Sequence, residues 1–172
     1  MHARGSERGA ALVEMAFALP LLVILILGMV SGGIAYNHQL ALTHSAREAG
    51  RYAATLPVTN FASMNGWLDE IAARAEEDAT GSLDPGAPGR VVCVAYVHPN
   101  GALATDSTSN RIDNLGTVSY AAAPCFADGR PDSERRVQVR VARETVFNLA
   151  FYSTTLTLDS EAVNRFEAGL GL

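Results

Sequence analysis

A single carboxylate stands just inside a long apolar stretch near the start of the chain. This residue is Glu14, and from Met15 to Ala46 the sequence contains no Asp, Glu, Lys or Arg. An ionised side chain at bilayer depth costs about 2.5–3.5 kcal/mol on insertion scales, so such a residue is a candidate functional site. Its chemistry would be charge neutralisation, because a nearby cation and the carboxylate each remove the other's desolvation penalty. The alternative is a boundary carboxylate that reaches the interface, since Glu14 lies only about one turn inside the helix.

Two cysteines form the second candidate site. Cys93 and Cys125 both follow the apolar stretch and are the only cysteines in the sequence. An even number of cysteines in an exported segment favours a disulfide between them. A loop of this size would stabilise the fold by about 3–4 kcal/mol in the chain-entropy description. Two buried thiols are the alternative.

Other reactive side chains do not form recognisable sites. The histidines His2, His38, His44 and His98 have no paired spacing with each other or with cysteines, so we expect no metal site. The acidic segment Asp106–Asp113 lacks the residue order of a calcium loop and is interpreted as a solvated loop. No nucleophile elbow, phosphate loop or dinucleotide fingerprint occurs. We therefore expect no catalytic residues, no cofactor and no enzyme activity, with a triad assembled by folding as the alternative.

Length and charge limit the remaining classes of function. The chain has 172 residues and a formal net charge of −5, so it fits one ordinary domain with an appendage. All 13 basic residues are arginines, and they are scattered rather than clustered. The sequence therefore offers no basic surface for nucleic acid.

The element that must position Glu14 is a membrane-spanning helix. The range Ala10–Tyr36 contains 27 residues, about 40 Å of helix, against a hydrocarbon thickness of about 30 Å. The preceding leader, Met1–Gly9, carries Arg4 and Arg8 against Glu7. This positive bias places the N-terminus in the cytoplasm and exports residues 37–172.

Small residues and a proline give this helix two further features. Pro20 removes a backbone hydrogen bond and is a candidate kink. Gly28 and Gly32 form a face of small residues, which would permit close approach of another helix within the membrane. Such faces also arise by chance, so a contact through this one is one of two interpretations.

The exported segment begins with helices. The first helix should continue to about Ala54 and end at Leu56–Pro57. Its apolar stripe should contain Leu42, Ala46, Ala49 and Ala53. A stripe from Phe61 to Ala75 at three- and four-residue spacing predicts a second helix, with Thr59 or Asn60 as its cap.

The rest of the exported segment predicts a sheet. Gly81–Gly89 breaks the helical pattern, and Val91–Val97 has apolar residues on both faces, as a covered central strand does. We expect a polar loop over Pro99–Gly116 and a short strand near Thr117–Ala121. Val137, Val139 and Val141 alternate with polar residues, which predicts one buried and one wet face. A last strand is expected over Thr154–Ala162, giving an α+β fold in which a helix packs on an antiparallel sheet.

The start of the chain resembles a known family. A charged leader ending in Gly9, then Ala10, then a glutamate five residues into an apolar helix is similar to a prepilin peptidase cleavage site. The sequence Arg8-Gly9-Ala10-Ala11-Leu12-Val13-Glu14-Met15-Ala16-Phe17-Ala18-Leu19-Pro20 resembles the pattern of TadE-like minor pilins. A second stretch agrees, because Leu40–Ala54 contains the Ala46-Arg47-Glu48-Ala49 element that recurs in that family.

The resemblance implies a function. Prepilin peptidase would cut the Gly9–Ala10 bond, and Glu14 would neutralise the new amine of a neighbouring subunit. The protein would be a minor pilin, or pseudopilin, of a tight-adherence type IV pilus that serves surface adhesion. Its partners would be TadF-like and TadG-like minor pilins, the major Flp pilin, the inner-membrane assembly platform and membrane lipid.

Two alternatives remain from the sequence. In a secreted or periplasmic protein, the apolar run would be a signal peptide cut after Ala35, so that the chain would begin at Tyr36. In a permanently anchored periplasmic binding protein or enzyme, the leader would remain and Glu14 would have no role.

Overall fold

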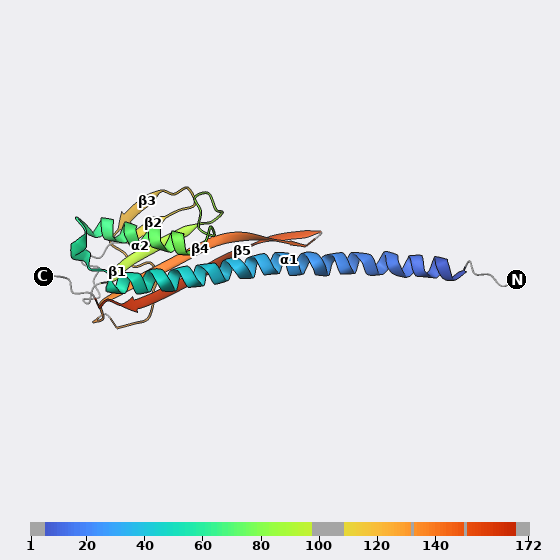
Figure 1. The fold of residues 1–172 in the computed structure, drawn as a ribbon, viewed down its shortest axis with the longest axis horizontal. Helices are drawn as coiled ribbons and strands as arrows, with labels where there is room; N and C mark the ends of the chain where they lie inside the picture. The colour runs from blue at the N-terminus through green and yellow to red at the C-terminus, as the bar shows by residue number, and fades with distance from the viewer. Residues whose placement is uncertain (1–5, 98–108, 132, 150, 168–172) are drawn as a thin grey trace.

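The structure, a computed structural model, describes residues 6–97, 109–131, 133–149 and 151–167. The first helix, α1, runs from Ser6 to Thr55 without interruption, including at Pro20. Figure 1 shows α1 as a long rod whose N-terminal part extends away from the remaining elements. Residues 1–5 of the leader, which include His2, lie outside the described residues, and so does His98.

A second helix lies beside the C-terminal half of α1. This helix, α2, spans Met64–Asp78, and a short 3-10 turn, η1, spans Val58–Asn60 between the two helices. The cap of α2 is Ser63, whose hydroxyl accepts a hydrogen bond from the N–H of Gly66 at 3.2 Å. The prediction of Thr59 or Asn60 as the cap was therefore wrong, because Asn60 belongs to the turn that follows Pro57.

Five antiparallel strands form one sheet in the order β3-β2-β1-β4-β5. Their bounds are β1 Val91–Val97, β2 Ser109–Ile112, β3 Val118–Ala121, β4 Arg136–Leu149 and β5 Tyr152–Arg165. The α+β fold class is confirmed. Strand β1 is central and almost wholly buried, as its two apolar faces predicted. The expected polar loop over Pro99–Gly116 was wrong in part, because its end forms β2, while residues 98–108 lie outside the described residues.

The core lies between the helices and one face of the sheet (Figure 1). It is built around Trp67 of α2, whose ring meets those of Tyr96 and Phe166 edge to face at centroid distances of 6.2 and 5.9 Å. The Trp67 Nε1–H donates to the Leu56 carbonyl at 3.0 Å, which satisfies the polar atom of the ring. These contacts join both helices to the sheet.

Strand β4 differs from the expectation of one wet face. Val137, Val139 and Val141 face the core as predicted. The alternate residues Arg136 and Gln138 are nevertheless buried, because the segment after β3 folds back over the outer face of the sheet. Periodicity identified which face was apolar but could not show that a loop covers the other face.

Candidate functional site

The N-terminal part of α1, from Gly9 to Leu27, is bare, in the sense that the rest of the chain does not cover its side chains. In the stretch from Gly9 to Leu27 almost every side chain is exposed. Among the described residues, this is the one helix long and apolar enough to cross a membrane. Leucine, isoleucine and valine side chains that the protein does not cover have a lower free energy in lipid than in water.

The predicted cleavage site and carboxylate both lie on this bare segment. Gly9 and Ala10 are exposed near the start of α1, and a Cβ at Gly9 would meet nothing within 4 Å. Glu14 is also exposed, and no residue in the described part of the chain pairs with it by an ion pair or hydrogen bond. The chain therefore presents the glutamate outward, where a group from another molecule can approach it.

A β-hairpin covers the small-residue face. The ends of β4 and β5 reach back along α1, as Figure 1 shows, and the tip of the hairpin meets the helix at Gly28 and Gly32. A Cβ at Gly28 would lie 3.2 Å from Leu149 Cδ2, and one at Gly32 would lie 3.8 Å from Phe147 Cε2. Between them, the Ser31 hydroxyl donates to the Asn148 carbonyl at 2.8 Å.

This contact changes the interpretation of the glycines. The sequence suggested another helix as their partner, whereas within the chain their partner is the hairpin tip. A helix from another subunit would have to share this face with Phe147 and Leu149. The folded domain also begins to cover α1 at Gly28. This is eight residues before Tyr36, the predicted end of the membrane-spanning helix.

Small residues hold the C-terminal half of α1 against the sheet. Leu42, Ala46, Ala49 and Ala53 form the predicted stripe and are fully buried. Gly50 lies so close to β5 that a Cβ there would stand 2.5 Å from Asn164 Nδ2. The hydroxyl of Ser45 donates to the Ala75 carbonyl of α2 at 2.5 Å. Within the element Ala46-Arg47-Glu48-Ala49, the two alanines thus serve packing on this side of the helix.

The two cysteines are joined across the outer face of the sheet. Cys93 in β1 and Cys125 in the segment after β3 form a disulfide with a Cα–Cα distance of 5.8 Å. The N–H of Cys125 donates to Gln138 Oε1 at 3.0 Å. The bond and this contact fix the covering segment over β1 and β4.

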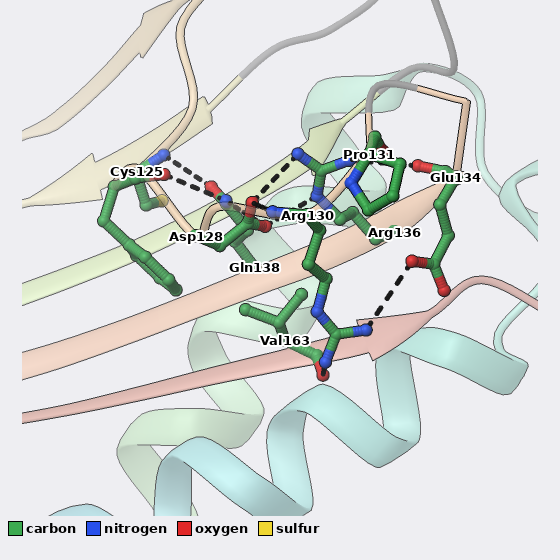
Figure 2. Close-up of polar contacts among 9 residues, drawn as sticks. Cys125, Asp128, Arg130, Pro131, Glu134, Arg136, Gln138 and Val163 are labelled. Atoms are coloured by element: carbon green, nitrogen blue, oxygen red, sulfur yellow. Dashed lines mark hydrogen bonds and ion pairs between the residues drawn. The ribbon is translucent and has the colours of Figure 1, made fainter. Parts of the chain in front are cut away.

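A buried carboxylate organises the rest of that covering segment (Figure 2). Asp128 accepts hydrogen bonds from Arg136 Nε at 2.6 Å, from Arg136 Nη2 at 3.0 Å and from Gln138 Nε2 at 2.9 Å. The remaining Arg136 nitrogen, Nη1, donates to the carbonyls of Pro131 and Glu134 at 3.0 and 3.2 Å. The guanidinium and carboxylate side chains are only 6% and 5% exposed.

The electrostatics of Asp128 follow from these contacts. Burial alone would raise the pKa of its carboxyl, but hydrogen bonds from Arg136, Gln138 and the Arg130 N–H outweigh that effect and hold the pKa below its usual range. The pair is thus ionised and satisfied within the chain. Sequence reasoning missed this pair, because Arg136 looked like a residue on a wet strand face.

His38 occupies the junction between α1 and the sheet. Its Nδ1 lies 3.1 Å from Ser82 Oγ and 3.3 Å from Arg143 Nη1. Burial, followed by the positive charge of Arg143, lowers the pKa of His38 from its usual value. A neutral imidazole accepting from Arg143 fits this position. In the described ranges, no three His, Cys, Asp or Glu residues gather into a metal-binding group.

Comparison with known proteins identifies the N-terminal region. The family model described as TadE-like protein matches residues 9–51, from the glycine of the expected cleavage site to the packed half of α1. This confirms the resemblance to the TadE-like family over those residues, which make up a quarter of the chain. No curated protein and no solved structure matches the chain.

Proposed function

We propose that this chain is a minor pilin: a non-enzymatic, structural subunit of a tight-adherence type IV pilus. The observation that carries the proposal is the TadE-like match over residues 9–51, which includes the Gly9–Ala10 bond and Glu14. In addition, the bare part of α1 is suited to a bilayer or a bundle of similar helices. The domain that follows has a complete core of its own.

Assembly would depend on a pair of charges at the helix start. Cutting after Gly9 produces an amine at Ala10, and Glu14 of a neighbouring subunit supplies the opposite charge. In a poorly solvated bundle an unpaired carboxylate is costly, so pairing selects one axial register between subunits. The outward position of Glu14 on the bare helix supports this role.

The partners and the location follow from the same proposal. The leader faces the cytoplasm, where prepilin peptidase acts, and the α+β domain lies on the periplasmic side of the inner membrane or in the extracellular filament. Partners in assembly are TadF-like and TadG-like minor pilins, the major Flp pilin and the assembly platform. The folded domain gives this subunit a surface that a pilin consisting of little more than a helix would lack.

The hairpin contact argues against the secreted alternative. A signal peptidase cut after Ala35 would remove Gly28, Ser31 and Gly32, which hold the hairpin tip. The half-buried side chains of Phe147 and Leu149 would then lose the surface on which they lie. Retention of α1 from Ala10 onward fits the structure better.

The first test is the N-terminus of membrane-extracted protein, measured by mass spectrometry in cells with and without prepilin peptidase. The proposal expects a chain that begins at Ala10 only when the peptidase is present. Gly9→Leu should abolish this cleavage, whereas Gly5→Leu, the matched change in the same leader, should leave it intact. A start at Tyr36, or an uncut leader in cells with the peptidase, would refute the proposal.

A second test addresses Glu14. Glu14→Gln removes the charge but keeps the size of the side chain, so cleavage should persist while piliation is lost or strongly reduced. Glu48→Gln is the control, because Glu48 lies on the same helix and makes only a surface pair with Arg51 at 3.3 Å. Equal piliation in the two variants would remove the proposed role of Glu14.

A further inference from the structure

The tip of the β4–β5 hairpin has an unusual composition for a surface element. From Thr145 to Leu158 the sequence contains no Asp, Glu, Lys or Arg. Charges resume at Glu144 on one strand and at Asp159 on the other, and Ala142 pairs with Asp159 in the sheet. The charge-free part of the hairpin is therefore its distal end, next to the helix segment that also lacks charges.

Large apolar side chains at this end are exposed. Phe151 is 90% exposed, Tyr152 63% and Val146 54%. Val146 lies on the face opposite Phe147 and Leu149, which lie against α1. Tyr152 is the register partner of Leu149 and shares its face, but it remains exposed. The tip thus uses one set of apolar residues to bind the helix and leaves another set uncovered. Exposed apolar side chains that cluster in this way mark an interaction surface.

The length of α1 determines where this surface lies relative to a bilayer. From Ala10 to Gly28 there are 19 residues, which make about 28 Å of helix, against a hydrocarbon core of about 30 Å. Any tilt shortens the span further. If Ala10 marks the boundary on the leader side, the opposite boundary falls at Gly28, where the hairpin tip lies. A bilayer crossed by α1 therefore reaches the tip.

We propose that the β4–β5 tip sits in the lipid at the boundary between head groups and acyl chains, in the leaflet that faces the folded domain. The inference rests on the membrane-spanning helix of the proposed function. Phe151, at the turn, enters the edge of the acyl region, and the Tyr152 ring lies at head-group level, where aromatic residues with a polar atom are favoured. Val146 lies farther along the hairpin, on the domain side of these two residues.

Backbone chemistry limits how deep the tip can go. Irregular backbone exposed to lipid is not tolerated within the hydrocarbon, because its polar groups lack partners there. The Asn148 carbonyl has a partner in Ser31, but a turn needs water or head groups for its other polar atoms. The charged residues Glu144 and Asp159 set the same limit from the domain side. The tip is therefore an interfacial element, which fixes the height and rotation of the domain above the membrane.

The test measures depth with a fluorescent label on the full chain in liposomes. Single cysteines are introduced as Phe151→Cys, as Leu19→Cys in the middle of the bare helix, and as Asn60→Cys beyond the C-terminal end of α1. Each is labelled with an environment-sensitive maleimide dye, which the disulfide-bonded Cys93 and Cys125 do not react with. Lipids carrying a nitroxide near the head group or deep in the acyl chain, and aqueous iodide, serve as quenchers.

The proposal expects three distinct profiles. The label at position 151 should emit at shorter wavelength than the label at 60 and lose most of its fluorescence to the shallow nitroxide. The label at 19 should respond most to the deep nitroxide, and the label at 60 only to iodide. Both Phe151 and Asn60 are exposed, so labelling should not disturb the fold.

Three other results would overturn the inference. A label at 151 that behaves like the one at 60, while 19 reports a deep position, leaves the anchor intact but places the tip in water. A label at 151 shielded from iodide yet insensitive to nitroxide lipids, with an effect that grows with protein density, identifies a second copy of the chain as the occupant. Failure of the label at 19 to reach the deep nitroxide would refute the membrane anchor itself.

Discussion

The two halves of α1 are both poor in charge, yet one half is exposed and the other packs against the rest of the chain. From Gly9 to Leu27 the helix carries mostly bulky aliphatic residues and leaves them exposed. Further along, Leu42, Ala46, Ala49 and Ala53 are fully buried. Three of these four buried residues are alanines, which allow the sheet to approach the helix backbone closely. The large aliphatic residues of the first half have no such surface of the chain beside them.

Charged groups show the same contrast. Asp128 in the domain is surrounded by partners from its own chain, whereas Glu14 on the bare helix has none among the described residues. The domain thus satisfies its own groups, and the anchor depends on lipid or on neighbouring subunits. Changes in the domain should therefore alter stability, and changes in the anchor should alter assembly.

The largest expected effect is at Asp128. Asp128→Ala leaves the Arg136 guanidinium buried without a counter-charge, which should lower the free energy of unfolding by about 3–5 kcal/mol. Urea unfolding of the full chain in detergent measures this loss. Glu134→Ala is the control, because its pair with Arg130 is partly exposed and spans 3.7 Å, so the change should stay within about 1 kcal/mol. Similar losses of unfolding free energy in both variants would contradict the conclusion that the domain supplies partners for its own buried charges.

A smaller effect is expected from two matched glycines on α1. Gly50→Leu forces a side chain into the 2.5 Å contact with Asn164, while a Cβ at Gly33 would meet nothing within 4 Å. Both changes give the same gain in helix propensity, about 1 kcal/mol. Gly50→Leu should therefore unfold at lower urea than Gly33→Leu, with a difference of about 1–3 kcal/mol from overpacking. Equal midpoints would mean that the packed face of α1 tolerates bulk as its open face does.

Much of this contrast could be predicted from the sequence. The absence of charge from Met15 to Ala46 gave the long helix, and the spacing of Leu42, Ala46, Ala49 and Ala53 gave its buried stripe. The break at Gly81–Gly89 and the apolar run Val91–Val97 located the central strand. These features are local, so periodicity within one segment was sufficient to predict them.

The missed features involve segments distant in sequence. Arg136 and Gln138 looked solvent-facing, because a strand pattern does not show which loop will cover it. Gly28 and Gly32 suggested a helix partner, because glycines show only that something approaches closely and not whether it is a helix or a hairpin. One local signal was available, namely the charge-free stretch Thr145–Leu158, which could have marked the hairpin tip as a second apolar surface.

The smallest expected effect is at His38, near the point where α1 passes from its bare half to its packed half. Its pKa is lowered in the folded chain, so the unfolded chain binds a proton first as the pH falls through about 6.5, the usual value for histidine. Stability should therefore decline between that pH and the lower folded pKa, and should be unaffected by this group above it. His38→Gln should make the pH dependence of the urea midpoint between pH 7 and 5 less steep. His44→Gln, at an exposed position about one and two-thirds turns along the same helix, is the matched control. A reduction of the pH dependence by His44→Gln as large as that by His38→Gln would contradict this prediction. It would mean that the contact with Ser82 and Arg143 does not control the protonation of His38, and that the junction between α1 and the sheet is as open to solvent as the bare half of the helix.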